Sequence, residues 1–275
     1  SRYRLGLESA RQQIRNVPAG NRARCALSGE AAEMAGDALT ADPPATTDTP
    51  LVAVAQDRII ALIRSEGLKA GQALPSEMAM AGQFGVSRPV VREALRSLAA
   101  LSLVDIGNGR RPRVRVPDAN VLGLIVDHAL HIEHASIQQI YDVRRTVEMR
   151  TVELAAVRRS TDEAARLLQL VEGMWADYPR LDEVMEHDIA FHLLIGRASR
   201  NPMFDLIVRS FEAVTRKTWR VGWLSRKTEG ERQGTIRLHQ RIAETIADGD
   251  AAAAAKAMAD HFDNSVKALL SAGLN

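Results

Sequence analysis

Four side chains in the C-terminal half have the types and spacing of a metal site. Asp188 and His192 are four residues apart, so a helix places the carboxylate and the imidazole on one face. His239 lies ten residues before Gly249 and His261 twelve residues after it, so in a helical hairpin they stand about 15 and 18 Å from the turn. One carboxylate and three neutral imidazoles that meet inside a bundle suit a divalent transition metal: zinc first, with nickel or manganese as alternatives.

The same residues also have a simpler explanation. An aspartate and a histidine at this spacing commonly form a hydrogen-bonded pair, and a lone core histidine commonly bonds a backbone carbonyl. His239 lies between Ile236 and Ile242 at helical spacing, and His261 follows Met258 in the same way, so both are expected on buried stripes. From the residues alone, a metal site and a set of satisfied core histidines both remain open.

Helices must position these donors, because the last part of the chain lacks the alternation of apolar and polar residues that is typical of strands. Aromatic residues make up only 4% of the chain and alanine is abundant, which also favours helices. Breaks between the helical stretches are predicted near residues 133–136, 159–161, 178–180, 201–202, 224–230 and 248–250. Residues 118–275 are therefore predicted to form an all-α antiparallel bundle of about seven helices.

The rest of the chain divides by charge and composition. Residues 51–116 contain ten lysines and arginines against five aspartates and glutamates, although the net charge of the whole chain is only +2. A compact basic segment suits a polyanion such as nucleic acid, with a merely solvated face as the alternative. Residues 1–50 end in a run of prolines and small polar residues that is typical of a flexible linker. We therefore expect three parts, over residues 1–50, 51–117 and 118–275.

The basic segment has the pattern of a winged helix-turn-helix. Helical periodicity and turn residues predict three helices and a hairpin, over residues 52–65, 76–84, 88–101 and 103–116. Ser76 and Ser87 are expected to cap the second and third helices, because a serine side chain accepts a hydrogen bond from an unpaired N–H in the first turn. The hairpin would turn at residues 107–109, with basic residues at its tip, and form the wing.

The third helix of this segment has an apolar face and a cationic face. Val91 and Ala94 begin an apolar stripe, whereas Arg88, Arg92 and Arg96 project from another side. An α-helix fits the major groove of DNA, where an arginine can bond two acceptors of one guanine. Arg88 and Arg92 are therefore candidates to read bases or hold phosphates, although arginines on a helix are often only solvated.

Three runs in this segment carry a closer resemblance, over residues 71–77, 84–88 and 91–98, which include the sequences Leu-Pro-Ser-Glu, Phe-Gly-Val-Ser-Arg and Val-Arg-Glu-Ala-Leu-Arg. Together they closely resemble the DNA-binding domain of GntR-family transcription regulators. The resemblance implies that Arg88 and Arg92 contact operator DNA and that Gly109 of the wing enters the minor groove. The expected DNA-contacting set is Arg88, Arg92, Arg96, Ser76, Ser87 and Gly109.

The segment also departs from the family pattern. Met78 stands where the family often has a DNA-contacting arginine, and Ser102 where it usually has a glycine. Residues 110–112 of the wing are Arg-Arg-Pro, where a small residue and an aromatic residue or threonine are usual. The operator sequence is therefore not carried over from the resemblance.

The C-terminal segment resembles the ligand-sensing FCD domain of the FadR-like GntR subgroup. The resemblance rests on the Asp188 and His192 pair followed by Asn201-Pro202, and on His239, Gly249 and His261 in that order. It implies a metal site formed by Asp188, His192, His239 and His261. It also implies that Arg144 and Asn201 bind the effector.

The other polar residues of this segment have less specific expectations. For Arg144 an alternative stays open, because Glu148 stands four positions later and an ion pair would also explain it. The remaining histidines are expected at the surface or around the site: His128, His131, His134 and His187.

These features predict a cytoplasmic, homodimeric transcription repressor. The winged helix would bind double-stranded operator DNA, and a small organic or sugar acid bound at the metal would control operator affinity. An enzyme is not expected, although a metal-dependent enzyme that uses the Asp/His3 site to activate water is the alternative, and a DNA-architectural protein is a third reading. No membrane partner is expected, because no apolar run approaches the ~20 residues that a spanning helix needs. The single cysteine permits no internal disulfide.

Overall fold

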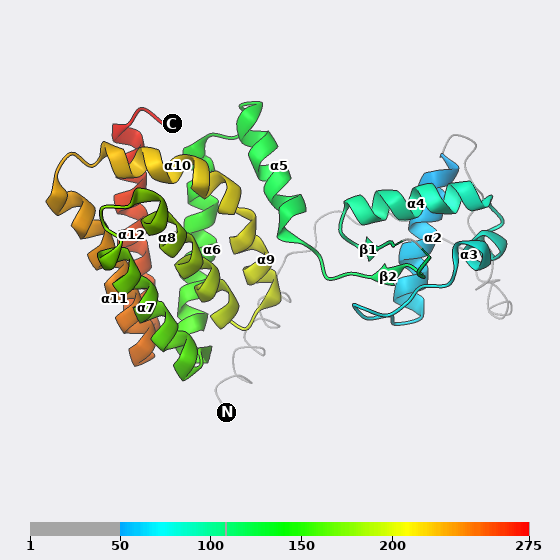
Figure 1. Ribbon diagram of the computed structural model, residues 1–275, viewed down its shortest axis with the longest axis horizontal. Helices are drawn as coiled ribbons and strands as arrows, with labels where there is room; N and C mark the ends of the chain where they lie inside the picture. Colours follow the sequence, from blue (N-terminus) through cyan, green and yellow to red (C-terminus); the bar gives the residue numbers. More distant parts are fainter. Residues whose placement is uncertain (1–49, 108, 275) are drawn as a thin grey trace, which may run out of the picture. The chain divides into compact units, whose positions relative to one another are not determined.

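The structure is a computed structural model in which residues 50–107 and 109–274 are described. The predicted extension over residues 1–50 lies outside the described residues, apart from Pro50, and so does Asn108 of the hairpin turn. The described chain is formed by helices with one small hairpin (Figure 1). The mostly helical fold class that the sequence predicts is confirmed.

The first described part contains three helices and a two-stranded hairpin. These elements are α2 (Leu51–Ser65), α3 (Glu77–Phe84), α4 (Arg88–Ala100), β1 (Val104–Asp105) and β2 (Arg113–Val114). The two strands are antiparallel, with Val104 opposite Val114. Buried apolar residues from all three helices form its core, among them Ile59, Met80 and Leu95. The predicted helix-turn-helix with a hairpin wing is therefore present.

The ends of α3 follow from its flanking residues. Ser76 Oγ accepts a hydrogen bond from the N–H of Ala79 at 3.2 Å, as expected for a capping serine. Gly85 ends the helix with a φ of 64°, in the left-handed conformation that glycine adopts without strain. Ser102 also adopts this conformation, with a φ of 57°, at the position where the sequence resemblance leads us to expect a glycine.

The predicted cap at Ser87 is wrong. Ser87 is the residue that precedes α4, but its side chain makes no capping hydrogen bond. Pro89 at the second position has no N–H to donate, and the side chain of Ser87 does not accept from the third N–H, that of Val90. The proline instead sets the backbone of the first turn by its fixed φ.

The remaining elements are helices that run to the end of the described chain. They are α5 (Ala119–His131), α6 (Ile137–Arg158), α7 (Thr161–Ala176), α8 (Leu181–Ala198), α9 (Pro202–Ser210), α10 (Glu212–Ser225), α11 (Glu229–Asp248) and α12 (Ala251–Ser271). All of the predicted breaks are present. A further break at Phe211 separates α9 from α10. No glycine or proline is present there, and Phe211 itself keeps helical backbone angles, so the sequence gives no turn signal.

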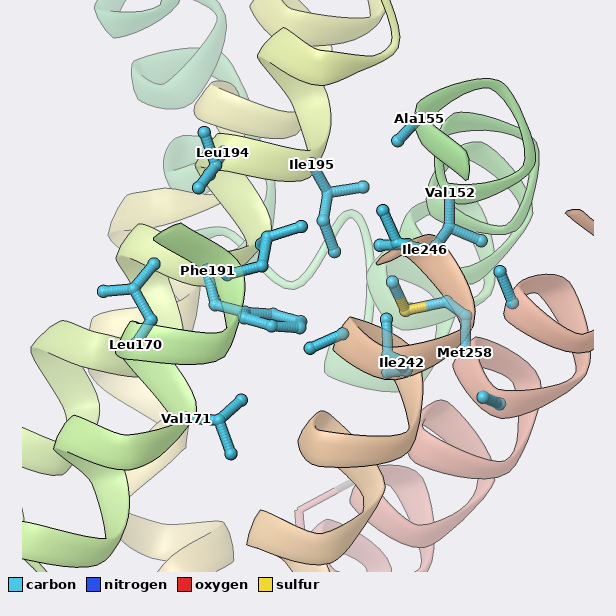
Figure 2. Packing of buried hydrophobic residues seen from close by; sticks show 14 of the residues in the cluster. Val152, Ala155, Leu170, Val171, Phe191, Leu194, Ile195, Ile242, Ile246 and Met258 are labelled. Carbon is cyan, nitrogen blue, oxygen red and sulfur yellow. The ribbon is translucent and has the colours of Figure 1, made fainter. Parts of the chain in front are cut away.

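The core of this bundle lies among α6, α7, α8, α11 and α12. Figure 2 shows Phe191 of α8, Ile242 of α11 and Met258 of α12 in this core, with Val152 of α6 beside them. Gly249 closes the hairpin between α11 and α12 with a φ of 76°. Within the residues that the structure describes, no helix combines the length and apolar composition needed to cross a bilayer.

Candidate metal centre and nucleic-acid interface

Three helices bring the predicted histidines together in the bundle core. His192 on α8, His239 on α11 and His261 on α12 are 3%, 1% and 5% exposed. Each offers one ring nitrogen, and these three nitrogens lie within 4.8 Å of one another. Asp188 is also buried, and its Oδ1 lies 2.7 Å from His239 Nε2. The structure therefore brings all four sequence-predicted donors to one place.

The hydrogen bonds of His239 determine which of its nitrogens is available. Its Nδ1 lies 3.0 Å from the carbonyl oxygen of Thr235, which can only accept, so Nδ1 carries the proton. Nε2 is then left with a lone pair that faces the carboxylate of Asp188, and this contact lacks hydrogen-bond geometry. Two electron-pair donors at this distance need a cation beside them.

The other two imidazoles have the same property. His192 Nδ1 bonds the buried carboxylate of Glu148, which leaves its Nε2 buried without a partner. His261 Nδ1 is likewise buried without a partner. Buried polar atoms are normally satisfied, and a histidine that ligates a metal typically donates its other N–H to a carboxylate or carbonyl. The donor set therefore fits a divalent metal, with Glu148 and the Thr235 carbonyl orienting two of the ligands.

Electrostatics keeps these groups in the forms that ligate metals. Burial lowers the pKa of His261 well below its usual value, and the nearby His239 and His192 lower it further, so this imidazole is neutral. Burial by itself raises the pKa of Asp188, but the positive charge that the surrounding histidines carry when protonated, His239 first, outweighs burial and lowers the pKa below its usual range. Neutral imidazole and ionised carboxylate are the forms that metals bind.

A small cavity of about 40 Å³ adjoins the cluster, where Asp188 and His261 form part of its wall. Arg144 also lines it and is 6% exposed. Its Nε donates to Glu148 Oε1 at 2.6 Å and one terminal NH2 group donates to Thr215 Oγ1 at 2.8 Å. The ion pair that the sequence left open is therefore present, and the same guanidinium also borders the cavity.

Glu148 links the arginine to the metal centre. Burial alone raises the pKa of Glu148, but the guanidinium of Arg144 and the imidazole of His192 outweigh burial and lower the pKa to about 2. One carboxylate oxygen bonds Arg144 and the other bonds His192. The position of Arg144 and the orientation of a histidine donor are therefore set by one side chain.

The structure does not bring Asn201 to this cavity. Its side chain accepts a hydrogen bond from the N–H of Met203 at 3.0 Å and caps α9, and it is not among the residues that line the cavity. The remaining histidines also lie outside the cluster. His128, His131 and His134 are exposed, and His187 is half-buried with its Nε2 2.8 Å from Asp177.

Sequence reasoning missed several residues of the cavity wall. They are Tyr141, Thr215, Thr218, Trp219, Trp223 and Arg226. Tyr141 and Thr218 share a buried hydrogen bond of 3.0 Å between α6 and α10. Arg226 directly follows α10 and continues the helical spacing of Thr215, Trp219 and Trp223, so a stripe in the sequence joins these positions. Nothing local in the sequence joins Tyr141 to them, because its contact with Thr218 spans 77 residues.

The predicted DNA-contacting residues share an open groove on the first part of the molecule. The groove is lined by Ser76, Met78, Arg88, Arg92, Arg96 and Gly109, together with Glu77, Arg110 and Arg111. Ser87 is not among its lining residues. Arg88 and Arg92 both bind Glu77 at 3.0 Å, while more than 40% of each arginine side chain stays exposed. The hydrogen bond from Arg92 also lowers the pKa of Glu77. One acidic residue therefore orients two exposed guanidinium groups on a basic surface.

Two families match the two described parts of the chain. Residues 51–114 match "Bacterial regulatory proteins, gntR family", and residues 139–264 match "FCD domain". The chain is 29% identical over 207 residues to the HTH-type transcriptional regulator LutR of Bacillus subtilis (strain 168), an alignment that covers 74% of this chain and 94% of that protein. It is 30% identical over 227 residues to the HTH-type transcriptional repressor NanR of Citrobacter rodentium (strain ICC168), which covers 78% and 82%.

A solved structure shows the same fold. Streptococcus agalactiae GntR aligns with a TM-score of 0.54 at 23% identity, over 78% of this chain and 97% of that chain. Both relatives named above are described as transcriptional regulators.

Proposed function

Because the chain belongs to the GntR family of DNA-binding transcription regulators and has a C-terminal FCD domain, we propose that it is a repressor whose operator affinity is controlled by a small carboxylic or sugar acid. The acid would bind in the cavity beside a divalent metal held by Asp188, His192, His239 and His261. A repressor is proposed because relatives of this chain carry that name.

The observation that carries this proposal is the set of three buried imidazole nitrogens without partners, next to the carboxylate of Asp188. When bound, a divalent metal would supply positive charge and open coordination positions to an anionic ligand. The residues of the chain would orient that ligand. The guanidinium of Arg144 can bond a carboxylate through N–H groups that Glu148 and Thr215 leave free, and the fork geometry favours a carboxylate over a single-point acceptor.

Operator binding would use α4 and the wing. The exposed guanidinium groups of Arg88, Arg92 and Arg96 stand on one groove with the tip of the hairpin. Arginines of this kind bind phosphates and the O6 and N7 acceptors of guanine. We expect a homodimer on a twofold operator, because one helix-turn-helix reads only a half-site.

The two functions would be coupled through the packing of the bundle. The donors come from α8, α11 and α12, so a ligand at their meeting point favours one arrangement of these helices over another. In a twofold dimer, such a change alters the spacing of the two DNA-binding parts and hence the affinity for a palindromic site. The effector and the operator must then weaken each other's binding by the same factor.

The proposal is tested by a gel-shift titration of the metal-loaded full chain on operator DNA selected from a random library, with and without a panel of carboxylic and sugar acids. At least one acid is expected to raise the Kd for the operator about tenfold, while nonspecific DNA binding changes little. If every acid leaves the Kd for the operator unchanged, the switching function is refuted and only DNA binding remains.

A further inference from the structure

Arg226 is a buried cation that the metal centre does not use. It follows directly after α10, is 8% exposed, and lines the same cavity as Asp188, Arg144 and His261. One of its terminal nitrogens donates to the carbonyl of Gly222 at 2.5 Å, but its Nε is buried without a partner. In the described part of the chain, no carboxylate forms an ion pair with it.

Arg226 lacks the carboxylate partner that Arg144 has. The charge of Arg144 is balanced by Glu148 at 2.6 Å, so that pair is complete without a ligand. Burial lowers the pKa of Arg226, and only the more distant Asp188, Tyr141 and Glu231 oppose this effect. A buried guanidinium stays charged, and an unpaired buried charge is strongly unfavourable unless an anion joins it.

Arg226 also borders the outside of the molecule. It lines a second, more open groove between α11 and α12, whose charged residues are Lys227, Arg237, Arg241, Lys267 and a single carboxylate, Glu231. A groove with this balance attracts anions and raises their local concentration. Arg226 therefore stands where a basic surface groove meets the buried cavity, which is the position of a binding group at the entrance.

We propose that Arg226 binds a second carboxylate of the effector, whose first carboxylate is held at Arg144 and the histidine cluster, so that the effector is a small dicarboxylate. This inference rests on the proposed function and names its ligand class. The cavity volume of about 40 Å³ has room for only a few water molecules, so a ligand must widen the cavity, and a short acid needs less widening than a bulky one.

The test measures ligand affinity by calorimetry, with the metal-loaded full chain and matched pairs of acids. The pairs are succinate with butanoate, glutarate with pentanoate, and glucarate with gluconate, so that each pair differs mainly in one terminal carboxylate. In at least one pair, the Kd of the dicarboxylate is expected to be lower than that of the monocarboxylate by a factor of about ten or more. This factor is what one charge-assisted hydrogen-bonded pair contributes. If no pair shows such a preference in the wild-type chain, the inference is overturned.

The variant Arg226→Gln distinguishes two ways to bind the second carboxylate: an ion pair with Arg226, or chelation of the metal together with the first carboxylate. The ratio of the two Kd values in the best pair is expected to fall to about one in Arg226→Gln, to be partly restored in Arg226→Lys, and to stay at the wild-type value in Arg159→Gln. Arg159 is a suitable control because it is also partly buried but bonds the Ala247 carbonyl and does not line the cavity. A preference that persists in Arg226→Gln refutes the role of Arg226.

The outcomes also distinguish this inference from the proposed function. If acids of both classes bind equally and still release the operator, the proposed function stands and only the second anchor is refuted. If none of the six acids binds and none changes operator affinity, both are refuted. Arg226→Gln is expected to fold, because glutamine removes an unpaired buried charge, and its thermal midpoint without ligand is expected to equal or exceed that of the wild type.

Discussion

Each buried imidazole of the cluster has one ring nitrogen that is buried without a hydrogen-bond partner. Thr235 and Glu148 bond the outer nitrogens of His239 and His192, and the inner nitrogens have no donor. An unsatisfied buried polar group costs roughly 1–3 kcal/mol, so three such groups weigh against the fold without a cation. A metal ion bound by these three nitrogens would satisfy all of them. The thermal stability of the chain therefore reports whether the site holds a metal.

Removal of metal is therefore expected to destabilise the chain. At a free metal concentration about 100 times the Kd, binding contributes about 2.7 kcal/mol, which corresponds to a thermal midpoint about 5–10 °C higher. The measurement is thermal unfolding before and after chelation, followed by addition of zinc, nickel or manganese. A midpoint that responds to none of these ions would contradict the metal centre.

The variant His239→Ala is expected to lose bound metal, because it removes one of the donors that close the site from three helices. His187→Ala is the matched control, since His187 is half-buried and bonds Asp177 outside the cluster. Elemental analysis of both proteins after dialysis measures the metal content. Full occupancy in His239→Ala, or equal loss in both variants, would show that His239 is not a ligand.

Spacing in the sequence predicted that these four side chains lie close together, because their positions depend on local geometry, whereas their role as metal ligands came from the family resemblance and stays a prediction. Asp188 and His192 share one turn of a helix, and His239 and His261 stand at similar heights on a hairpin. The simpler explanation was also partly right, since His239 does bond a backbone carbonyl, but with only one of its two nitrogens. The contact between Glu148 and His192 joins positions 44 residues apart, and nothing local in the sequence could have predicted it.

At the scale of elements, α4 and the wing form a basic surface on which Glu77 holds Arg88 and Arg92 side by side. Arg92→Ala is expected to abolish specific operator binding, because it removes an exposed guanidinium from the groove and leaves Glu77 with one partner. Fluorescence anisotropy with labelled operator DNA measures the effect, with a loss of at least about tenfold in affinity expected.

Arg64→Ala provides the control for this surface. Arg64 is exposed on α2 and does not line the groove, so its removal subtracts one positive charge without touching the interface. Normal operator binding by Arg92→Ala, or equal weakening by both variants, would refute the assignment of α4 as the recognition helix.

The hairpin of α11 and α12 depends on the left-handed backbone of Gly249. Gly249→Ala is expected to lower the free energy of unfolding by about 1 kcal/mol or more, because a Cβ disfavours this conformation. Gly234→Ala, inside α11 with open space around the added Cβ, is expected to raise it by up to about 1 kcal/mol. Urea unfolding distinguishes the two, and equal effects at both positions would contradict this account of the turn.

Helix bounds were largely predictable because caps and breakers are local signals. Ser76, Gly85 and Gly249 mark their helix ends as expected. Two local features differ from the expectation: Ser87 makes no side-chain cap before Pro89, and no turn residue marks the break at Phe211. Arg226 was missed although it continues the helical spacing of Trp219 and Trp223, because a charged side chain at a helix end is normally expected at the surface.

At the scale of the whole molecule, one chain combines a DNA-binding part with a helical part whose apolar core contains one polar cluster. The family matches over residues 51–114 and 139–264 agree with the resemblances seen in the sequence. The division into residues 1–50, 51–117 and 118–275 and the homodimer stay predictions. The unpartnered histidine nitrogens and Arg226 Nε are the buried groups that a metal and a ligand would complete, and they connect the interior to the proposed regulation.

The most direct test measures whether release of the operator depends on the metal centre. Operator affinity is determined by fluorescence anisotropy for the metal-loaded wild type, the chelated wild type and His239→Ala, each with and without the acid that gives the largest effect. We expect the acid to weaken operator binding about tenfold in the metal-loaded wild type and to leave the operator affinity of the other two proteins unchanged. An equal response to the acid in all three proteins would contradict it.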